Sequence, residues 1–222
     1  MNQYIDLSHV IEEKLITYKG LPAPVICDYL SREASKPLYA EGATFQIGKI
    51  EMVGNTGTYI DCPFHRYEDG KDLAQTGLNK LVNLPAVLIR APYQHGIEIG
   101  IEFFMKIEVA RHAVIVHTGW SEFWNTERYY TKHPYLNAEA ARYLRDQNVL
   151  LVGIDSHNID DTRNNARPVH SILLKNEILI VEHLCELDKI TSDQFFFSAV
   201  PPKIKGMGTF PVRAYATIDQ HP

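Results

Sequence analysis

The stretch NAEAARYLRDQNVLLVGIDS, residues 137–156, decides the fold class of this chain. Its first half predicts a helix over 137–147, because Asn137 is a good N-cap and small or apolar residues follow at helical spacing. Its second half, Val149 to Ile154, is apolar throughout and predicts a buried strand that gives way to polar residues at Asp155. A helix that leads directly into a buried strand is typical of an α/β fold.

Segments on either side continue this alternation of strands and helices. Strands are predicted at Ile47 to Val53, Thr58 to Asp61, Ala86 to Arg90, Ala113 to Thr118 and Ile178 to Val181. Proline at the first position predicts a short helix from Pro168 to Lys175. Because no repeat, low-complexity tract or flexible linker interrupts the chain, we expect one α/β domain over residues 1–222.

Composition narrows the class of protein. The chain has 222 residues, 45% of them hydrophobic, which is ample for a buried core, and its net charge of −5 gives no attraction to nucleic acid. Neither a signal peptide nor an apolar run of membrane-spanning length is present, so we expect no membrane partner and a cytoplasmic location. Three scattered cysteines fit a reducing compartment and argue against a thiolate zinc site.

The segment NTGTYIDCPFH, residues 55–65, carries the strongest chemical signal. In an extended segment Tyr59, Asp61 and His65 share one parity and point to one face. An aspartate and a histidine facing the same cavity are two candidate metal ligands.

Two later residues, His170 and Glu182, could complete such a site together with Asp61 and His65. Carboxylates and imidazoles suit zinc or manganese, and a catalytic site needs about three protein ligands with one position open for water. Spacing alone does not show that the two pairs converge, since about a hundred residues separate them.

Structural alternatives exist for each candidate. Asp61 could cap a turn or pair with an arginine, and His65 could simply hydrogen-bond to Asp61. His170 could lie on a helix surface, and Glu182 could pair with Lys175 or Lys189. Three further histidines could replace missing ligands, although loop or strand histidines usually bond to backbone: they are His9, His117 and His157.

The chain resembles the putative cyclase superfamily, which includes bacterial kynurenine formamidases and isatin hydrolases. The similarity runs in the family's order through YIDLSHVI, VHTGWSEFW, PYLNAEAARYL, PVHSILLKNEILIVEHLCELDKI and PPKIKGMGTFPVRAYA. The resemblance implies the swivelling β/β/α fold of that family, a homodimer or homotetramer, and hydrolysis of a small amide or lactam by metal-activated water.

The family's metal motif, HxGTHxDxPxH, is kept here only in part. Asn55 and Tyr59 stand where the family has two histidines, whereas Asp61 and His65 are retained. An amide oxygen is a poor zinc ligand, and a phenol with a pKa of about 10 must lose its proton to bind a cation well. We therefore expect weaker metal binding, or a preference shifted toward oxygen-preferring metals.

His170 and Glu182 match a later histidine and glutamate around the family's metal pair. The resemblance implies that Asp61, His170 and Glu182 hold one divalent metal, zinc or manganese, and that His65 is the general base. Tyr59 is a second candidate catalytic residue, as a hydrogen-bond donor or an acid.

The leading hypothesis is an arylformamidase-type hydrolase, which converts N-formylkynurenine to kynurenine and formate in tryptophan catabolism. Asn55, Trp120 and Trp124 are candidate substrate contacts, although the tryptophans also suit core or interface packing. One alternative is a metal-free cyclase or dehydratase-type lyase that uses His65, Asp61 and Tyr59. Another is a small-molecule binder without catalysis.

Overall fold

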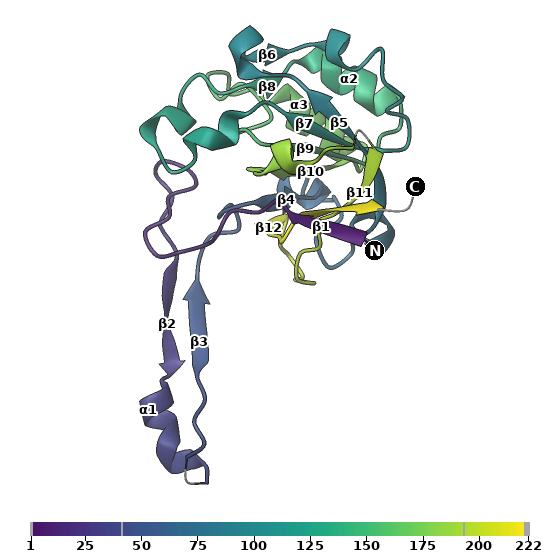
Figure 1. Ribbon diagram of the computed structural model, residues 1–222. Coiled ribbons are helices and arrows are strands. Elements are labelled where there is room, and N and C mark those ends of the chain that lie inside the picture. Colours follow the sequence, from purple (N-terminus) through teal and green to yellow (C-terminus); the bar gives the residue numbers. More distant parts are fainter. Residues whose placement is uncertain (1, 41, 193, 220–222) are drawn as a thin grey trace.

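A curled sheet forms the body of the protein (Figure 1). The computed structural model describes residues 2–40, 42–192 and 194–219, and within these ranges nine strands join in the order β1-β13-β11-β5-β7-β9-β10-β4-β12. These strands are β1 (Asn2–Asp6), β4 (Tyr59–Asp61), β5 (Leu84–Arg90), β7 (Ala113–His117), β9 (Leu151–Ile154), β10 (Leu179–Glu182), β11 (Gln194–Ser198), β12 (Thr209–Pro211) and β13 (Tyr215–Asp219).

The centre of the sheet is parallel and confirms the predicted alternation. Strands β5, β7, β9 and β10 run parallel, and all four fall within two residues of segments predicted as strands. The other strands pair antiparallel, among them β4 with both β10 and β12. A further short pair joins β6 (Glu98–Ile99) to β8 (Tyr135–Leu136).

Two helices cover one face of the parallel strands. Helix α2 (Ala138–Asp146) begins as predicted, with the Asn137 side chain accepting a hydrogen bond from the Ala140 amide, and α3 spans Pro168–Lys175. Their apolar side chains, such as Leu144 and Leu173, pack on Val114 and its neighbours. No helix in the described part of the chain is long and apolar enough to cross a bilayer.

The sheet curls so that the side chains on its opposite face pack against one another. Ile60, Ile115, Phe197 and Ala216, which come from strands across the whole sheet, belong to one buried cluster. With the helices on the outer face, the layers run β/β/α, which confirms the predicted α/β architecture.

One expectation about local structure is confirmed and one is wrong. The strand predicted from Ile47 to Val53 is present as β3 (Ile47–Glu51), two residues shorter, and it lies outside the main sheet. The extended conformation expected through His65 stops at Asp61, because Pro63 starts a 3₁₀ turn over Pro63–His65. His65 is therefore brought back beside Asp61 by a turn rather than by strand parity.

A hairpin arm projects from the body (Figure 1). It consists of β2 (Val25–Leu30) paired antiparallel with β3, and a tip that contains the short helix α1 (Arg32–Ser35). A bulge lies between Asp28 and Leu30. We call residues 25–51 the arm.

The turn that carries His65 rests on Gly208. A Cβ built on Gly208 would lie 2.5 Å from the His65 Cα and 2.9 Å from the Phe64 carbonyl carbon, closer than any side chain can pack. Only glycine at 208 lets β12 approach this turn.

We predict that Gly208→Ala lowers the free energy of unfolding by about 1–3 kcal/mol, because the backbone atoms it meets cannot move aside like a side-chain end. Gly77→Ala is the matched control. A Cβ there would meet mainly the Asn79 amide oxygen, 2.6 Å away, which can rotate, and Gly77 has an ordinary φ of −74°. Urea unfolding of both variants measures the difference, and equal stability would contradict this account.

Candidate metal and catalytic site

Strand register at one end of the sheet assembles the site. On β4, Tyr59 lies opposite Glu182 of β10, and Asp61 lies opposite Thr209 of β12. Asp61 and Glu182 are both completely buried. Two carboxylates are thus fixed beneath the surface on neighbouring strands, so Glu182 is not paired with a surface lysine.

Helix α3 adds an imidazole whose orientation is set by Asp160. The Asp160 carboxylate accepts hydrogen bonds from the backbone amides of Val169 and His170, at 2.8 and 2.9 Å. It also accepts the Nδ1 proton of His170, at 2.7 Å. A carboxylate on Nδ1 leaves Nε2 as the free nitrogen, as for most metal-binding histidines.

Three donor atoms then face one gap. His170 Nε2 lies 3.6 Å from Asp61 Oδ2 and 3.7 Å from Glu182 Oε1. These separations are too long for hydrogen bonds, but they approach the edge of a tetrahedron, about 3.3–3.6 Å for bonds of about 2.0–2.2 Å. Asp61 Oδ2 is buried without any hydrogen-bond partner. Asp61 and His170 fit a divalent cation; in the described part of the chain, the group whose ligand atoms all lie within 4.8 Å of one another is completed by His65 and does not include Glu182.

The titration of these groups reflects crowded negative charge. Burial disfavours the imidazolium of His170, but the Asp160 hydrogen bond and the carboxylates of Asp61 and Glu182 outweigh it and raise the pKa of His170 to about 10. Burial raises the pKa of Glu182 to about 7. Burial also opposes ionisation of Asp61, yet the His65 and His170 imidazoles hold its pKa below the usual value. A bound cation would take the place of the proton on His170 Nε2.

His65 is oriented by a second hydrogen-bond chain. The Thr209 hydroxyl donates to Asp61 Oδ1, so its oxygen accepts the Nδ1 proton of His65, 2.7 Å away. The lone pair of His65 is therefore on Nε2. His65 side-chain atoms line the cavity and are about one third exposed, at 34%. A ligand atom of His65 also lies within 4.8 Å of those of Asp61 and His170.

Tyr59 uses its proton to hold Glu182. Its hydroxyl donates to Glu182 Oε2 at 2.6 Å, while the Ile159 amide donates to Oε1 at 2.7 Å. Burial and the Glu182 charge raise the pKa of Tyr59 well above its usual value, so the phenol stays neutral. His183 Nε2 lies 3.4 Å from the same hydroxyl.

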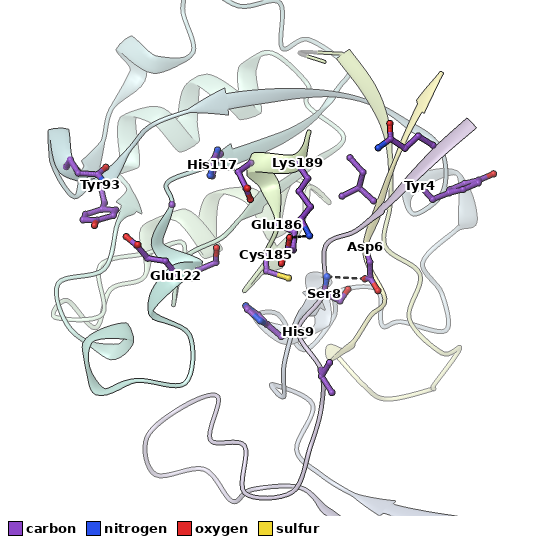
Figure 2. A pocket seen from close by; sticks show the side chains of 17 residues that line it. Tyr4, Asp6, Ser8, His9, Tyr93, His117, Glu122, Cys185, Glu186 and Lys189 are labelled. Carbon is purple, nitrogen blue, oxygen red and sulfur yellow. Dashed lines mark hydrogen bonds and ion pairs between the residues drawn. The ribbon is translucent and has the colours of Figure 1, made fainter. Parts of the chain in front are cut away.

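A cavity of about 270 Å³ opens onto these groups. Asn55 and Tyr59 line it, although their roles toward a substrate stay predictions, and Arg66 and Arg167 also belong to its wall. A larger cavity of about 1000 Å³ shares no lining residue with it and is bordered by β1 and the segment after β10 (Figure 2). The larger cavity lacks the buried carboxylates, and we place the chemistry in the smaller one.

Other predicted contacts lie elsewhere. Trp120 is buried and donates its indole proton to the Tyr129 carbonyl, and Trp124 stacks on His9 with ring centroids 3.8 Å apart. Neither tryptophan borders the smaller cavity, so their role in substrate binding stays a prediction. In the described part of the chain, His9, His117 and His157 do not join Asp61, His65 and His170 as a possible ligand group.

Sequence reasoning missed Asp160 and Thr209, and also Arg66 and Arg167 in the wall of the cavity. Asp160 follows strand β9 within the polar segment DSHNID, so its place after a buried strand was a usable signal. Thr209 is 144 residues from His65, and nothing in its local sequence marks it.

Comparisons with known proteins concern the family and the fold of this chain. The model of the putative cyclase family matches residues 5–161. A kynurenine formamidase of Geobacillus thermodenitrificans is 30% identical over 218 residues, covering 96% of this chain and 97% of that protein. A structure of a predicted metal-dependent hydrolase from Bacillus stearothermophilus superposes with a TM-score of 0.77 at 25% identity, covering 98% of each chain. An isatin hydrolase bound to the product analogue thioisatinate gives 0.83 at 18% identity, covering 99% of this chain and 93% of that one.

Buried histidines near the site predict sensitivity to acid. Burial, with a smaller contribution from the charge of His133, lowers the pKa of His157 from 6.5 to about 3. Between pH 6.5 and pH 3, His157 is protonated in the unfolded chain but neutral in the folded chain. The contribution of His157 to the free energy of unfolding is therefore fully present above pH 6.5 and is lost as the pH falls toward 3. His157→Gln should reduce the loss by up to about 1.4 kcal/mol per pH unit in that window. Thermal unfolding from pH 7 to pH 4 tests this, with the exposed His95→Gln as control; an unchanged pH dependence in His157→Gln would refute it.

Proposed function

The chain belongs to the putative cyclase family and is a hydrolase of C–N bonds, and we propose that it cleaves the formyl amide of an arylformamide such as N-formylkynurenine. Its relatives over nearly the whole chain are kynurenine formamidases. The observation that carries the proposal is the gap between Asp61, His170 and Glu182, in which a completely buried carboxylate oxygen has no partner.

The three residues around this gap would hold one metal ion. When bound, a divalent metal polarises the amide carbonyl and makes water acidic enough to react near neutral pH. Two carboxylate oxygens and one imidazole nitrogen suit zinc or manganese. We propose a single ion because Asn55 and Tyr59 offer no imidazole, and because the Tyr59 hydroxyl already donates its hydrogen bond to Glu182.

His65 is the proposed general base. Its Nδ1 proton is bound to Thr209, so Nε2 is free to accept a proton from the attacking water. The same nitrogen then returns that proton to the departing amine as the C–N bond breaks, and the products are the free amine and formate. Thr209 and Asp61 keep the imidazole in the tautomer that this cycle needs.

Tyr59 has a positioning role in this scheme. It fixes Oε2 of Glu182 and leaves Oε1 facing the gap. A metal-free lyase would need Tyr59 to donate its proton to the substrate. In this structure the Tyr59 hydroxyl donates a hydrogen bond to the Glu182 carboxylate instead. The hydrolase is therefore the better-supported function.

The cavity wall favours an anionic substrate of modest size. A volume of about 270 Å³ suits a compound with a single aromatic ring, and Arg66 and Arg167 can pair with a carboxylate away from the reacting amide. A formylated aromatic amine that bears an amino-acid side chain has both features.

Metal content tests the site directly. Protein purified without chelator should retain about one equivalent of zinc or manganese, and Asp61→Asn should lose it because an amide oxygen binds these ions poorly. Asp161→Asn, a nearby aspartate that instead pairs with Arg163, is the matched control. Elemental analysis gives the stoichiometry; unchanged metal in Asp61→Asn would exclude this residue as a ligand.

Turnover of N-formylkynurenine, followed by the absorbance of kynurenine, tests the activity. We expect His65→Gln to lower kcat by about 10²–10⁴-fold. Retained metal in this variant would assign His65 as the base, whereas lost metal would make it a ligand, since its ligand atom lies within 4.8 Å of those of Asp61 and His170. His95→Gln should behave as the unchanged protein. Metal-loaded protein that cleaves no arylformamide would overturn the substrate, and an active His65→Gln would overturn the base.

A further inference from the structure

One completely buried residue beside the site has a strained backbone. His183, which directly follows Glu182 at the end of β10, has a φ of +58°, in the left-handed region that favours glycine. Among the non-glycine residues with positive φ in the described part of the chain, His183 alone is buried. Such a conformation costs free energy and persists only where the surroundings hold it in place, often at a functional site.

Hydrogen bonds to the following backbone hold His183 in this conformation. The Thr58 hydroxyl donates to the His183 carbonyl at 2.6 Å, and the Leu184 amide donates to the Ile154 carbonyl at 3.0 Å. Thr58 also accepts a hydrogen bond from the His9 amide, 3.0 Å away. The backbone after the strained φ is therefore fixed by the segments that enter β4 and leave β9.

The strained conformation brings His183 to the same group as Glu182. Successive residues of a strand point to opposite faces, so residues 182 and 183 would not meet one side chain if β10 continued. Here both contact the Tyr59 hydroxyl, Glu182 through Oε2 at 2.6 Å and His183 through Nε2 at 3.4 Å. The positive φ of His183 is therefore what lets its imidazole reach Tyr59.

The direction of each hydrogen bond follows from the single proton of each phenol. Tyr59 donates to Glu182, so its oxygen accepts from His183, whose Nε2 must carry a proton. Complete burial disfavours a charged imidazole, so Nδ1 of His183 has a lone pair. The Tyr129 hydroxyl lies 2.9 Å from that Nδ1 and donates to it. These groups form one directed chain, in the order Tyr129, His183, Tyr59 and Glu182.

We propose that His183 is a positioning residue that acts on the metal gap through Tyr59. An imidazole N–H on the Tyr59 oxygen turns the phenol proton toward Glu182 and strengthens its donation, because hydrogen bonds in a buried chain polarise one another. Glu182 Oε1 is then left facing His170 Nε2, 3.7 Å away. This inference deepens the proposed function and rests on its assignment of Glu182 as a metal ligand.

A packing role for His183 makes a different prediction. Its ring lies among aromatic side chains, with the ring centroids of Trp124 and His157 at 5.5 and 5.8 Å. Packing depends on the ring, whereas positioning depends on the two ring nitrogens. Substitutions that keep one and remove the other therefore separate the two roles.

Zinc affinity, measured by competition with a chromophoric chelator, makes this separation. His183→Phe keeps a ring but removes both nitrogens, and it should weaken zinc binding by about 10–100-fold. His183→Gln loses the ring, but its amide can donate to Tyr59 and accept from Tyr129, so it should recover most of that loss. Tighter zinc binding by His183→Phe than by His183→Gln would overturn the proposal.

Tyr129→Phe tests the far end of the chain with a smaller change. It removes one hydroxyl group and should weaken zinc binding by about tenfold. Tyr130→Phe is the matched control, because the Tyr130 hydroxyl donates to the Ile16 carbonyl, outside the chain, and zinc affinity should not change. If the His183 variants do not fold, this pair decides, and equal zinc affinity of the two phenylalanine variants would overturn the proposal.

Nitrogen NMR of the zinc-free protein reads the tautomer of His183 directly. The directed chain requires a protonated Nε2 and an unprotonated Nδ1. The reverse tautomer would leave Nε2 without a proton for the Tyr59 oxygen, and it would overturn the proposal.

These measurements also separate the inference from the proposed function, because none of them needs a substrate. A protein that binds zinc with the expected pattern but cleaves no arylformamide would overturn the proposed function and leave the role of His183 intact. Unchanged zinc affinity in His183→Phe and Tyr129→Phe would overturn the role of His183 even in an active arylformamidase. A protein that binds neither zinc nor manganese would overturn both.

Discussion

The burial of three carboxylates around one imidazole is the constraint on which the site depends. Asp61, Asp160 and Glu182 are all removed from water, and His170 is the common neighbour of all three. Buried negative charge without compensation is costly. Asp160 is compensated by backbone amides at the start of α3, and Glu182 by Tyr59 and a backbone amide. Only Asp61 keeps an oxygen without a hydrogen-bond partner, and the His170 imidazole, whose pKa is raised to about 10, lies 3.6 Å from it and supplies positive charge there.

The sheet explains why these residues meet. Strand β4 is short, but it has β10 on one side and β12 on the other, so alternate residues of one three-residue strand face Glu182 and Thr209. Helix α3 delivers His170 from the adjoining crossover between β9 and β10. Site and fold are thus coupled, since a shift of one residue in either pairing would turn Asp61 away from the gap.

Much of this arrangement could be predicted from local sequence. The parallel strands were predictable from their apolar runs, and the helices from Asn137 at the start of α2 and Pro168 at the start of α3. The set Asp61, His65, His170 and Glu182 came partly from residue chemistry and partly from resemblance to a family. Local sequence patterns do not predict which distant strands pair, and the partners of β4 lie about 120 and 150 residues later in the chain. For the same reason Thr209 was missed, and β3, although recognised as a strand, was not recognised as part of an arm.

The hydrogen bond from Tyr59 to Glu182 limits which residues can replace Tyr59. The resemblance to the family's metal motif implies a histidine at position 59, whereas here a phenol stands there and donates to Glu182 Oε2. Without a donor at position 59, the glutamate would keep only its contact with Asn158 at that oxygen, at a long 3.4 Å. Position 55 would also have to change before a second nitrogen-rich metal position existed. Tyr59 thus serves the site by holding Glu182 in place and not as a nitrogen ligand.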